Sequence, residues 1–313
     1  MNYTLHQLQV FLKITQTKSI TKAAEELHLT QPAISIQLRN FQNQFDIPLT
    51  EIVGRKLYVT EFGNEIAVAA QRIIDEVNMI NFRTSAYKGM LSGRLRISIV
   101  STGKYVMPYY LSEFMNSNRG VDLDMDVTNK LKVVQSLKDN EVDFALVSVL
   151  PKDLLLEHLI LLENKLFLVG SKKLTLEPEA KMETIFTHYP SIYREEGSAT
   201  RTAMENFLNN RNISTGMKLQ LTSNEAVKQA LIAGLGISIM PLIGLKNELE
   251  RGDLKIIPIK GLPITTDWRL VWLKNKPLSP VAKAFLDFIQ EKKEDIFENF
   301  FSWINTIHPP DFH

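Results

Sequence analysis

Polar and basic side chains that suit contacts with double-stranded DNA lie close together near the start of the 313-residue chain. Gln31, Ser35 and Arg39 fall on the polar face of an expected helix, and the adjacent cations Arg55 and Lys56 follow in an expected hairpin. A glutamine amide can pair with adenine through two hydrogen bonds. Hydroxyl and cationic groups can hold phosphates. These residue types predict a surface that contacts both bases and the DNA backbone.

A second set of polar side chains follows strand-like segments further along the chain. In open α/β sheets, ligands bind beyond the carboxyl ends of strands, where helix N-termini favour anions. An arginine there can meet a carboxylate or a phosphate. The residues selected in this way are Ser101, Thr102, Thr128, Asn129, Ser148, Arg194, Gly197, Ser198, Thr200, Arg201 and Asn224. The alternatives are simple helix caps for the Ser, Thr and Asn residues, and surface ion pairs with Glu195 or Glu196 for the arginines.

Catalytic patterns are missing from the sequence. The six histidines are scattered without metal-binding spacing, and the chain has no cysteine. It has no nucleophile elbow, Walker loop or dinucleotide fingerprint. We therefore expect no enzymatic activity, no metal and no cofactor.

The charge balance limits the classes of partner. The chain has 36 Lys and Arg against 35 Asp and Glu, which excludes a strongly cationic nucleic-acid binder but not a small DNA-binding module. Residues 1–60 have a surplus of two positive charges, which two copies would double. The first residues do not match a signal peptide, and no apolar run approaches the ~20 residues of a membrane span. We expect a cytoplasmic protein without a membrane partner.

Residues 1–60 predict short helices followed by a hairpin. Ser19 is a good N-cap for the second helix, Pro32 suits the first turn of the third, and the segment 52–60 alternates around Gly54. Apolar positions recur at helical spacing: Leu5, Leu8, Phe11 and Leu12, then Ile20, Ala23, Ala24 and Leu27, then Ile34, Leu38, Phe41 and Phe45. The pattern is typical of a winged helix-turn-helix. A three-helix bundle with a polar outer face is the alternative.

Residues 61–90 predict one long helix. The segment 64–88 contains neither Gly nor Pro, and a seam of residues steps alternately by four and three. The seam consists of Ile66, Ala70, Ile73, Val77, Ile80, Thr84 and Tyr87. Such a heptad pattern favours a dimerising helix, with Thr84 as its polar member. The alternative is a long helix packed on its own domain.

From residue 91 to about residue 293, strand-like and helix-like segments alternate. Expected strands cover 95–99, 121–127, 143–149, 166–170, 191–194, 217–221, 237–240, 254–259 and 268–273. This alternation predicts a parallel or mixed sheet covered by helices. A closing helix is expected near 280–292, and the aromatic segment 296–304 is either a last helix packed on the domain or an oligomer contact.

Two motifs resemble those of LysR-type transcriptional regulators. The first is Ser19-Ile20-Thr21-x-Ala23-Ala24-Glu25-x-Leu27-x-Leu29-Thr30-Gln31-Pro32-Ala33-Ile34-Ser35, and the second is Gly54-Arg55-Lys56-Leu57-Tyr58-Val59-Thr60-x-x-Gly63. The chain departs from the common pattern at Ile36, Thr50 and Ile52. The stretch 194–201 resembles the corresponding stretch in one branch of this family, which includes regulators of carbon fixation and of sulfur or nitrogen assimilation.

The resemblance implies a fold class and its boundaries. It implies an α-rich winged helix-turn-helix over 1–60, a dimerising linker helix over 61–90 and a regulatory domain over 91–293 like a periplasmic binding protein. That α/β domain would divide into subdomain one, 91–162 with 267–293, and subdomain two, 163–266. Residues 294–313 would form a C-terminal extension.

The resemblance also implies a function. The chain would bind specific DNA through Thr30, Gln31, Pro32, Ser35, Ile36, Arg39, Arg55 and Lys56. A small, anionic effector would bind between the subdomains. The further partners would be RNA polymerase and a second copy of the chain, with dimer and tetramer both left open. The alternative function is a cytoplasmic small-molecule-binding protein or scaffold without a regulatory role on DNA.

Overall fold

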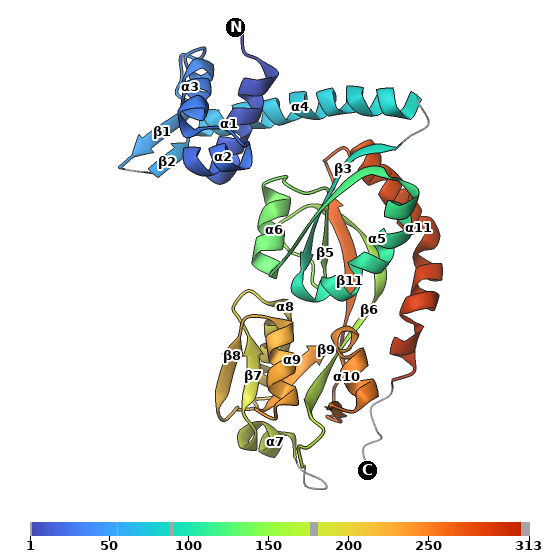
Figure 1. Ribbon diagram of the computed structural model, residues 1–313. Helices are drawn as coiled ribbons and strands as arrows, with labels where there is room; N and C mark the ends of the chain where they lie inside the picture. Colours follow the sequence, from blue (N-terminus) through green and yellow to red (C-terminus); the bar gives the residue numbers. More distant parts are fainter. Residues whose placement is uncertain (1, 55, 88–90, 176–180, 308–313) are drawn as a thin grey trace. The chain divides into compact units, whose positions relative to one another are not determined.

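The computed structural model describes residues 2–54, 56–87, 91–175 and 181–307, apart from the side chains of residues 78 and 81–87. The chain divides into two compact units, Met1–Gly93 and Arg94–His313. Figure 1 labels their helices and strands. Within the described residues, no helix is both long and apolar enough to cross a membrane.

The first unit packs its helices around a shared apolar core. Its elements are α1 (Leu5–Thr17), α2 (Ile20–Glu26), α3 (Gln31–Gln42), β1 (Thr50–Val53), β2 (Lys56–Val59) and α4 (Glu61–Tyr87). The starts of the first three helices are set by the side chains of Thr4, Ser19 and Thr30, which accept hydrogen bonds from backbone N–H groups in the first turn. Helix α3 ends at Gln42, before the predicted Phe45, whose ring still packs against Phe41 at 5.1 Å.

The wing is an antiparallel pair of β1 and β2, with Gly54 at a φ of 66° in its turn. Gly63, in the first turn of α4, lies very close to the chain that enters the wing. A Cβ at Gly63 would lie 2.1 Å from the backbone oxygen of Leu49, so this position has no room for a side chain. The contact explains why a glycine follows the wing.

The first turns of α4 pack inside the first unit. Ala70, predicted for the dimer seam, is only 1% exposed and belongs to the core, and Ile66 packs against that core. These two positions therefore correct the predicted seam, because their own unit already covers them. Ile73 is 40% exposed, and the side chain of Tyr87 lies outside the described residues. The alternative of a helix packed on its own domain holds for this first part of α4.

The second unit is a mixed α/β fold. Its strands are β3 (Ser92–Val100), β4 (Gly120–Thr128), β5 (Phe144–Val147), β6 (Leu156–Ser171), β7 (Ser191–Arg194), β8 (Lys218–Leu221), β9 (Ile237–Pro241), β10 (Leu254–Ile257) and β11 (Ile264–Leu273). Its helices are η1 (Ser101–Tyr105), α5 (Met107–Ser117), α6 (Lys130–Lys138), α7 (Met182–His188), α8 (Ala199–Asn209), α9 (Asn224–Ile232), η2 (Leu242–Gly244), α10 (Lys246–Arg251), α11 (Pro280–Phe300) and η3 (Ser302–Asn305). The strand order is β4-β3-β5-β11-β6-β9-β7-β8, with β10 paired to β6.

The long strands β6 and β11 connect the two ends of this sheet (Figure 1). They run antiparallel, and the two expected boundaries between the subdomains, after residue 162 and before residue 267, lie almost opposite each other. Asp267 pairs with Glu163, and Trp268 pairs with Leu162. Both strands are longer than predicted. Polar residues such as Asn164 and Lys165 interrupt the apolar pattern there, and both of them pair with β11.

Helix α11 continues to Phe300, beyond its predicted end near residue 292. After it, the buried ring of Phe301 lies 5.2 Å from that of Tyr109 and 6.0 Å from that of Tyr110, both on α5. The ammonium group of Lys246, on α10, lies 5.3 Å from the ring of Trp303. Residues 294–307 therefore pack on their own unit, which is one of the two alternatives predicted for the extension.

Candidate functional site

Helix α3 has a buried face and a polar face. Ile34, Leu38 and Phe41 are buried in the core. On the other side, the side-chain amide of Gln31 donates to the Ser35 hydroxyl over 3.4 Å, at the upper limit of a hydrogen bond. The residues of this face that are exposed are Thr30, Gln31, Pro32, Ile36 and Arg39, and Ser35 is half-buried. The polar groups predicted to contact DNA are thus accessible on one helix face.

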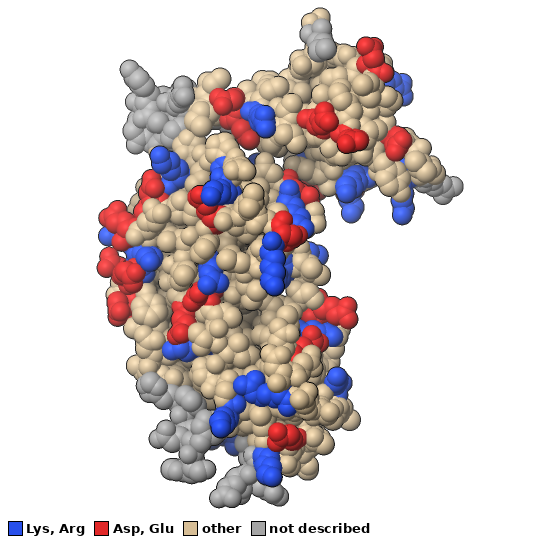
Figure 2. All heavy atoms as spheres, turned by 180° about the vertical axis from the view of Figure 1, so that it is seen from behind, with Lys and Arg blue, Asp and Glu red and all other residues tan. Residues whose placement is uncertain are grey.

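The wing adds a cation beside an apolar strand. Lys56 is exposed on β2, and Arg55 lies outside the described residues. Ile52, on β1, is 69% exposed, an unusual place for a large apolar side chain. Lys and Arg are interspersed with Asp and Glu on the face of the chain in Figure 2, as the net charge of +1 leads one to expect. Any DNA contact therefore depends on local cations.

In the second unit, strand direction brings the predicted cleft residues to two sheet edges. Strands β3 and β5 are parallel, so Ser101, Thr102 and Ser148 follow their carboxyl ends. Strands β7 and β8 are also parallel, which places Arg194 and Asn224 at the second edge. This matches the sequence argument that ligand-binding groups collect beyond the carboxyl ends of strands.

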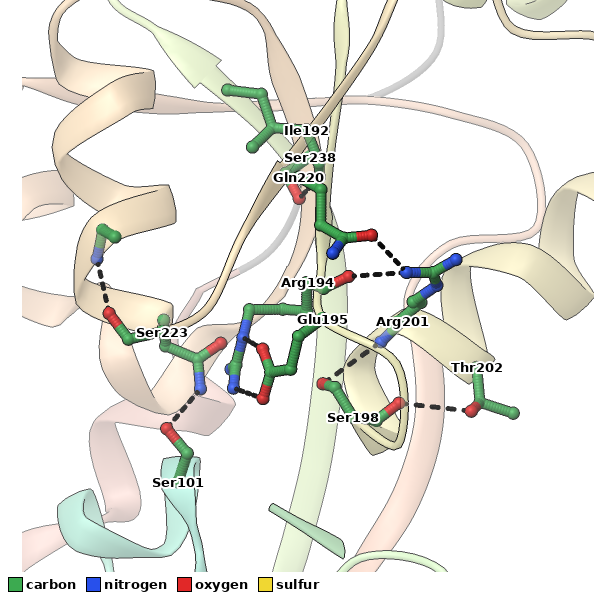
Figure 3. A network of polar contacts seen from close by, with 12 residues as sticks. Ser101, Ile192, Arg194, Glu195, Ser198, Arg201, Thr202, Gln220, Ser223 and Ser238 are labelled. Carbon is green, nitrogen blue, oxygen red and sulfur yellow. Dashed lines mark hydrogen bonds and ion pairs between the residues drawn. The ribbon is translucent and has the colours of Figure 1, made fainter. Parts of the chain in front are cut away.

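A hydrogen bond joins these two edges. The Asn224 amide nitrogen donates to the Ser101 hydroxyl over 3.3 Å, and Asn224 is only 2% exposed (Figure 3). The Asn224 Oδ1 atom is buried and has no hydrogen-bond partner. Because an unpaired buried acceptor is costly, this atom favours a bound donor at this point.

Several predicted residues act as helix caps. Ser198 accepts from the Arg201 backbone N–H at the start of α8, and Asn129 accepts from the Lys132 N–H at the start of α6. Helix α9 is capped by Ser223, one residue before Asn224. The cap alternative is therefore observed for Ser198 and Asn129. The caps also leave the positive ends of α8 and α9 beside Arg194 and Asn224.

The two predicted arginines are held in different ways. Arg194 is 4% exposed and makes a two-point ion pair with Glu195, with nitrogen–oxygen distances of 2.7 and 2.8 Å (Figure 3). Arg201 pairs with Glu205 at 2.7 Å and donates to Gln220 at 2.8 Å. The expected alternative of an ion pair with Glu195 or Glu196 is therefore observed for both arginines, because Arg201 also lies 3.9 Å from the exposed Glu196 carboxylate. The pair of Arg194 differs from a surface pair in that its arginine is buried.

The remaining predicted residues lie around the same loops. Thr102, Ser148 and Thr200 are buried, and Thr128 is the last residue of β4. Gly197 has a φ of 82°, and a Cβ there would lie 2.6 Å from the Leu131 side chain. The positive φ favours glycine at this position, and the loop before α8 lies against the exposed Leu131 side chain in the first turn of α6.

A neighbouring cavity of about 370 Å³ was not predicted. It is lined by a face of α8 and by residues of other segments. The α8 residues are Ala199, Thr202, Ala203, Asn206 and Phe207, and the others are Lys130, Val149, Asn210, Arg211, Gly261, Ile264 and Thr266. Burial lowers the pKa of Lys130, against the nearby charge of Asp153. The sequence signal for this wall is a run of small and polar residues at i, i+3, i+4 and i+7 after the cap of α8.

Comparisons with known proteins identify the family. Residues 5–64 match the model described as a bacterial regulatory helix-turn-helix protein of the lysR family, and residues 88–294 match the LysR substrate binding domain. The chain belongs to the LysR family. It is a LysR-type transcriptional regulator with a helix-turn-helix and an effector-binding domain, and family members of this kind bind DNA and small-molecule effectors.

The chain is similar to LysR regulators of carbon fixation. The chain is 36% identical to the transcriptional activator CmpR of Synechocystis over 92% of this chain and 95% of that protein. It is also 36% identical to a RuBisCO operon transcriptional regulator of Allochromatium vinosum over 92% and 96% of the two chains.

Solved structures show the same architecture. The Synechocystis CcmR regulatory domain in complex with 2-phosphoglycolate is 31% identical, covering 65% of this chain and 99% of that one with a TM-score of 0.61. Full-length CbnR complexed with its target DNA, at 18% identity and a TM-score of 0.59 over 92% and 99% of the chains, supports the fold alone.

Proposed function

We propose that α3 is the recognition helix of this regulator and that the wing holds the DNA backbone. In this proposal Gln31 reads a base edge, Ile36 meets a thymine methyl, and Ser35 positions the helix on a phosphate. Thr30, Pro32 and Arg39 lie along the same contact, and Arg55 and Lys56 hold phosphates from the wing. The exposure of the described α3 side chains supports this assignment.

We further propose that α4 joins two copies of the chain beyond its first turns. Ile73 is the supporting observation, because it is a large apolar side chain with 40% of its surface exposed. Val77, Ile80 and Tyr87 continue the seam. Sedimentation of Ile73→Glu should show a shift toward the monomer, while Glu76→Gln on the exposed side should leave the assembly unchanged. Equal assembly of both variants would place the interface elsewhere.

The effector that we propose is a small metabolite with phosphate and carboxylate groups, of the 2-phosphoglycolate class. It would bind between subdomain one (91–162 and 267–293) and subdomain two (163–266). One observation carries this proposal: the bond between Asn224 and Ser101 brings two carboxyl sheet edges together beside Arg194 and two helix N-termini. The 2-phosphoglycolate bound to the similar CcmR domain of Synechocystis supports the chemical class.

In this proposal the effector acts by preferring one arrangement of the two subdomains. A ligand shifts such an equilibrium only by its difference in affinity between the two states. The predicted ligand-binding residues belong to both sheet edges, so a bound effector would fix the distance between the two subdomains. That distance would in turn affect how the DNA-binding units of the assembled regulator are spaced. The regulator would act in the cytoplasm, with RNA polymerase as its further partner.

Calorimetric titration of the full-length chain tests the effector class. We expect wild-type protein to bind 2-phosphoglycolate more tightly than inorganic phosphate or glycolate alone. Thr102→Val, which removes a buried hydroxyl after β3, should weaken binding by about 10- to 150-fold, because a lost hydrogen bond to an anion costs about 1.5–3 kcal/mol.

Thr202→Val, on the α8 face that lines the neighbouring cavity, is the matched control and should bind normally. A loss confined to Thr202→Val would move the effector to that cavity. Wild-type protein that binds none of the three compounds would contradict the proposed effector class.

A further inference from the structure

The anion-binding arginine of the proposed cleft already has a carboxylate partner from its own chain. The Glu195 carboxylate accepts two hydrogen bonds from the Arg194 guanidinium, at 2.7 and 2.8 Å. This two-point geometry is the one that a ligand carboxylate or phosphate would use. Figure 3 shows the pair at the end of β7, with the Arg194 side chain extending toward the side on which Ser101 lies.

We propose that Glu195 is an internal counter-ion, which an anionic effector must displace from Arg194. The inference rests on the effector site proposed above and adds a residue that sets its affinity and selectivity. In this proposal Arg194 keeps its position in both states, and its partner changes from the Glu195 carboxylate to the effector anion.

The burial of the two side chains supports this division. The Arg194 side chain is 4% exposed, whereas that of Glu195 is 18% exposed. A guanidinium that is almost fully buried needs a counter-charge at all times, because a lone buried charge is strongly disfavoured. Glu195 lies in the turn between β7 and α8, so its carboxylate can turn toward water while an effector takes over the pairing.

Local charge explains why displacement is needed. Arg194 and Glu195 together carry no net charge, so an anion that entered without displacing Glu195 would meet a carboxylate within a few ångströms. Like charges at such distances repel appreciably inside a protein. The neighbouring Arg201 does not replace Arg194, since it is held by Glu205 and Gln220.

Selectivity follows from this competition. A ligand with one carboxylate offers Arg194 no more than Glu195 does, and Glu195 has the advantage of being attached to the same chain. A phosphorylated carboxylate carries more charge and can also use the N-termini of α8 and α9. The counter-ion therefore discriminates against simple monocarboxylates.

The test compares Glu195→Gln with Glu196→Gln in the full-length chain. Glu196 is the matched control, because it carries the same charge one residue away, is 88% exposed and lies 3.9 Å from Arg201. Calorimetry with 2-phosphoglycolate should show about tenfold tighter binding for Glu195→Gln, from the removal of one nearby like charge. Glycolate, the monocarboxylate probe, should become a measurable ligand of the same variant.

Glu196→Gln should change either affinity by no more than about twofold, as expected for an exposed charge. Unchanged or weaker binding of 2-phosphoglycolate by Glu195→Gln, with wild-type binding intact, would overturn the counter-ion inference alone. Absence of binding by wild type and by both variants would overturn the proposed effector as well.

A crystal structure of the wild-type chain with 2-phosphoglycolate provides a test that does not depend on a variant folding. We expect the ligand on Arg194 and the Glu195 carboxylate beyond hydrogen-bond distance. A complex in which the ligand is bound and the Arg194–Glu195 pair is intact would overturn the inference.

Discussion

The proposed recognition helix α3 and the proposed effector cleft both use helix N-termini, hydroxyls, amides and arginines, but they hold these groups differently. On α3, Gln31 and Arg39 are exposed, and the bond from Gln31 to Ser35 is long at 3.4 Å. In the cleft, Arg194 and Asn224 are 4% and 2% exposed and are bonded to Glu195 and Ser101. The polar groups of α3 are free to contact a partner, whereas those of the cleft already form an ion pair or a hydrogen bond with each other.

The difference reflects the partners. DNA covers a large surface and can contact side chains that extend into water, so an exposed helix face is sufficient. A small metabolite must be surrounded, and the groups that surround it are buried even when it is absent. Buried polar groups need partners, so the cleft supplies internal ones. Substitutions on the helix should therefore change binding alone, whereas substitutions in the cleft should change binding and folding together.

The largest effect is expected at Arg194. Arg194→Ala removes a side chain that is only 4% exposed, together with its two-point ion pair to Glu195, so the free energy of unfolding of the regulatory unit should fall by about 3 kcal/mol. Arg39→Ala, on the exposed face of α3, should change stability by less than about 0.5 kcal/mol. Urea denaturation of both variants measures this contrast. If Arg194→Ala and Arg39→Ala lost equal stability, the cleft and the exposed face of α3 would not differ in the way proposed.

The next effect is expected at Gln31, and it should concern DNA rather than folding. Gln31→Ala should weaken binding to the specific site by about 1–3 kcal/mol and leave the melting temperature unchanged. Fluorescence anisotropy with the upstream DNA of the regulator's own gene and with random DNA measures the two affinities. If random DNA loses as much affinity as the specific site, Gln31 positions the helix and does not read a base.

A smaller effect is expected for the bond across the cleft. A double-mutant cycle of Asn224→Ala and Ser101→Ala should give a coupling of about 1 kcal/mol in the free energy of unfolding, the usual contribution of one hydrogen bond. A coupling of zero would mean that the bond between the two sheet edges contributes nothing to the ligand-free fold.

Lys56 should have a modest and uniform effect on DNA binding. Lys56→Ala should weaken specific and random DNA equally and lower the slope of log affinity against log salt by about 1. Lys18→Ala, in the turn between α1 and α2, serves as the comparison. A loss of affinity restricted to the specific site would assign base reading to the wing.

The smallest effect is expected from Glu225, beside Asn224. A hydrogen bond from Gln229 and a further one from Lys228 hold the pKa of the Glu225 carboxyl below its usual value, although burial acts to raise it. Its charged form therefore stabilises the fold above the ordinary pKa, and this contribution is lost as the pH falls through the lowered pKa. Glu225→Gln should remove about 0.3–0.5 kcal/mol at pH 7 but little at pH 3, as denaturation at both values can measure. An equal difference at both pH values would contradict this account.

The elements of the first unit could be predicted well because their signals are local. The cap of α2 at Ser19, the Pro at the start of α3 and the glycine in the wing each act within a few residues. The ends of long elements were less predictable. Strand β6 extends over Leu156–Ser171 because β11 pairs with it, and Ala70 is buried because α4 packs back on α1. Both outcomes depend on segments distant in the sequence.

The cleft shows the same division. The rule that ligands bind beyond the carboxyl ends of strands selected Ser101, Arg194 and Asn224 from the sequence, since strand order along the chain is enough to apply it. Two features could not be predicted without the positions of the side chains. They are the pairing of Arg194 with Glu195 rather than Glu196, and the cavity beside α8.

The sequence by itself determined the helix-turn-helix, the alternation of strands and helices and the face of α3 that points away from the core, because these follow from hydrophobic period and local capping. Only the tertiary structure decided which groups of the cleft pair with each other, since some of these partners, such as Ser101 and Asn224, are more than a hundred residues apart in the chain. Electrostatic and hydrogen-bond energies change steeply over a few ångströms, and no spacing along the chain records them.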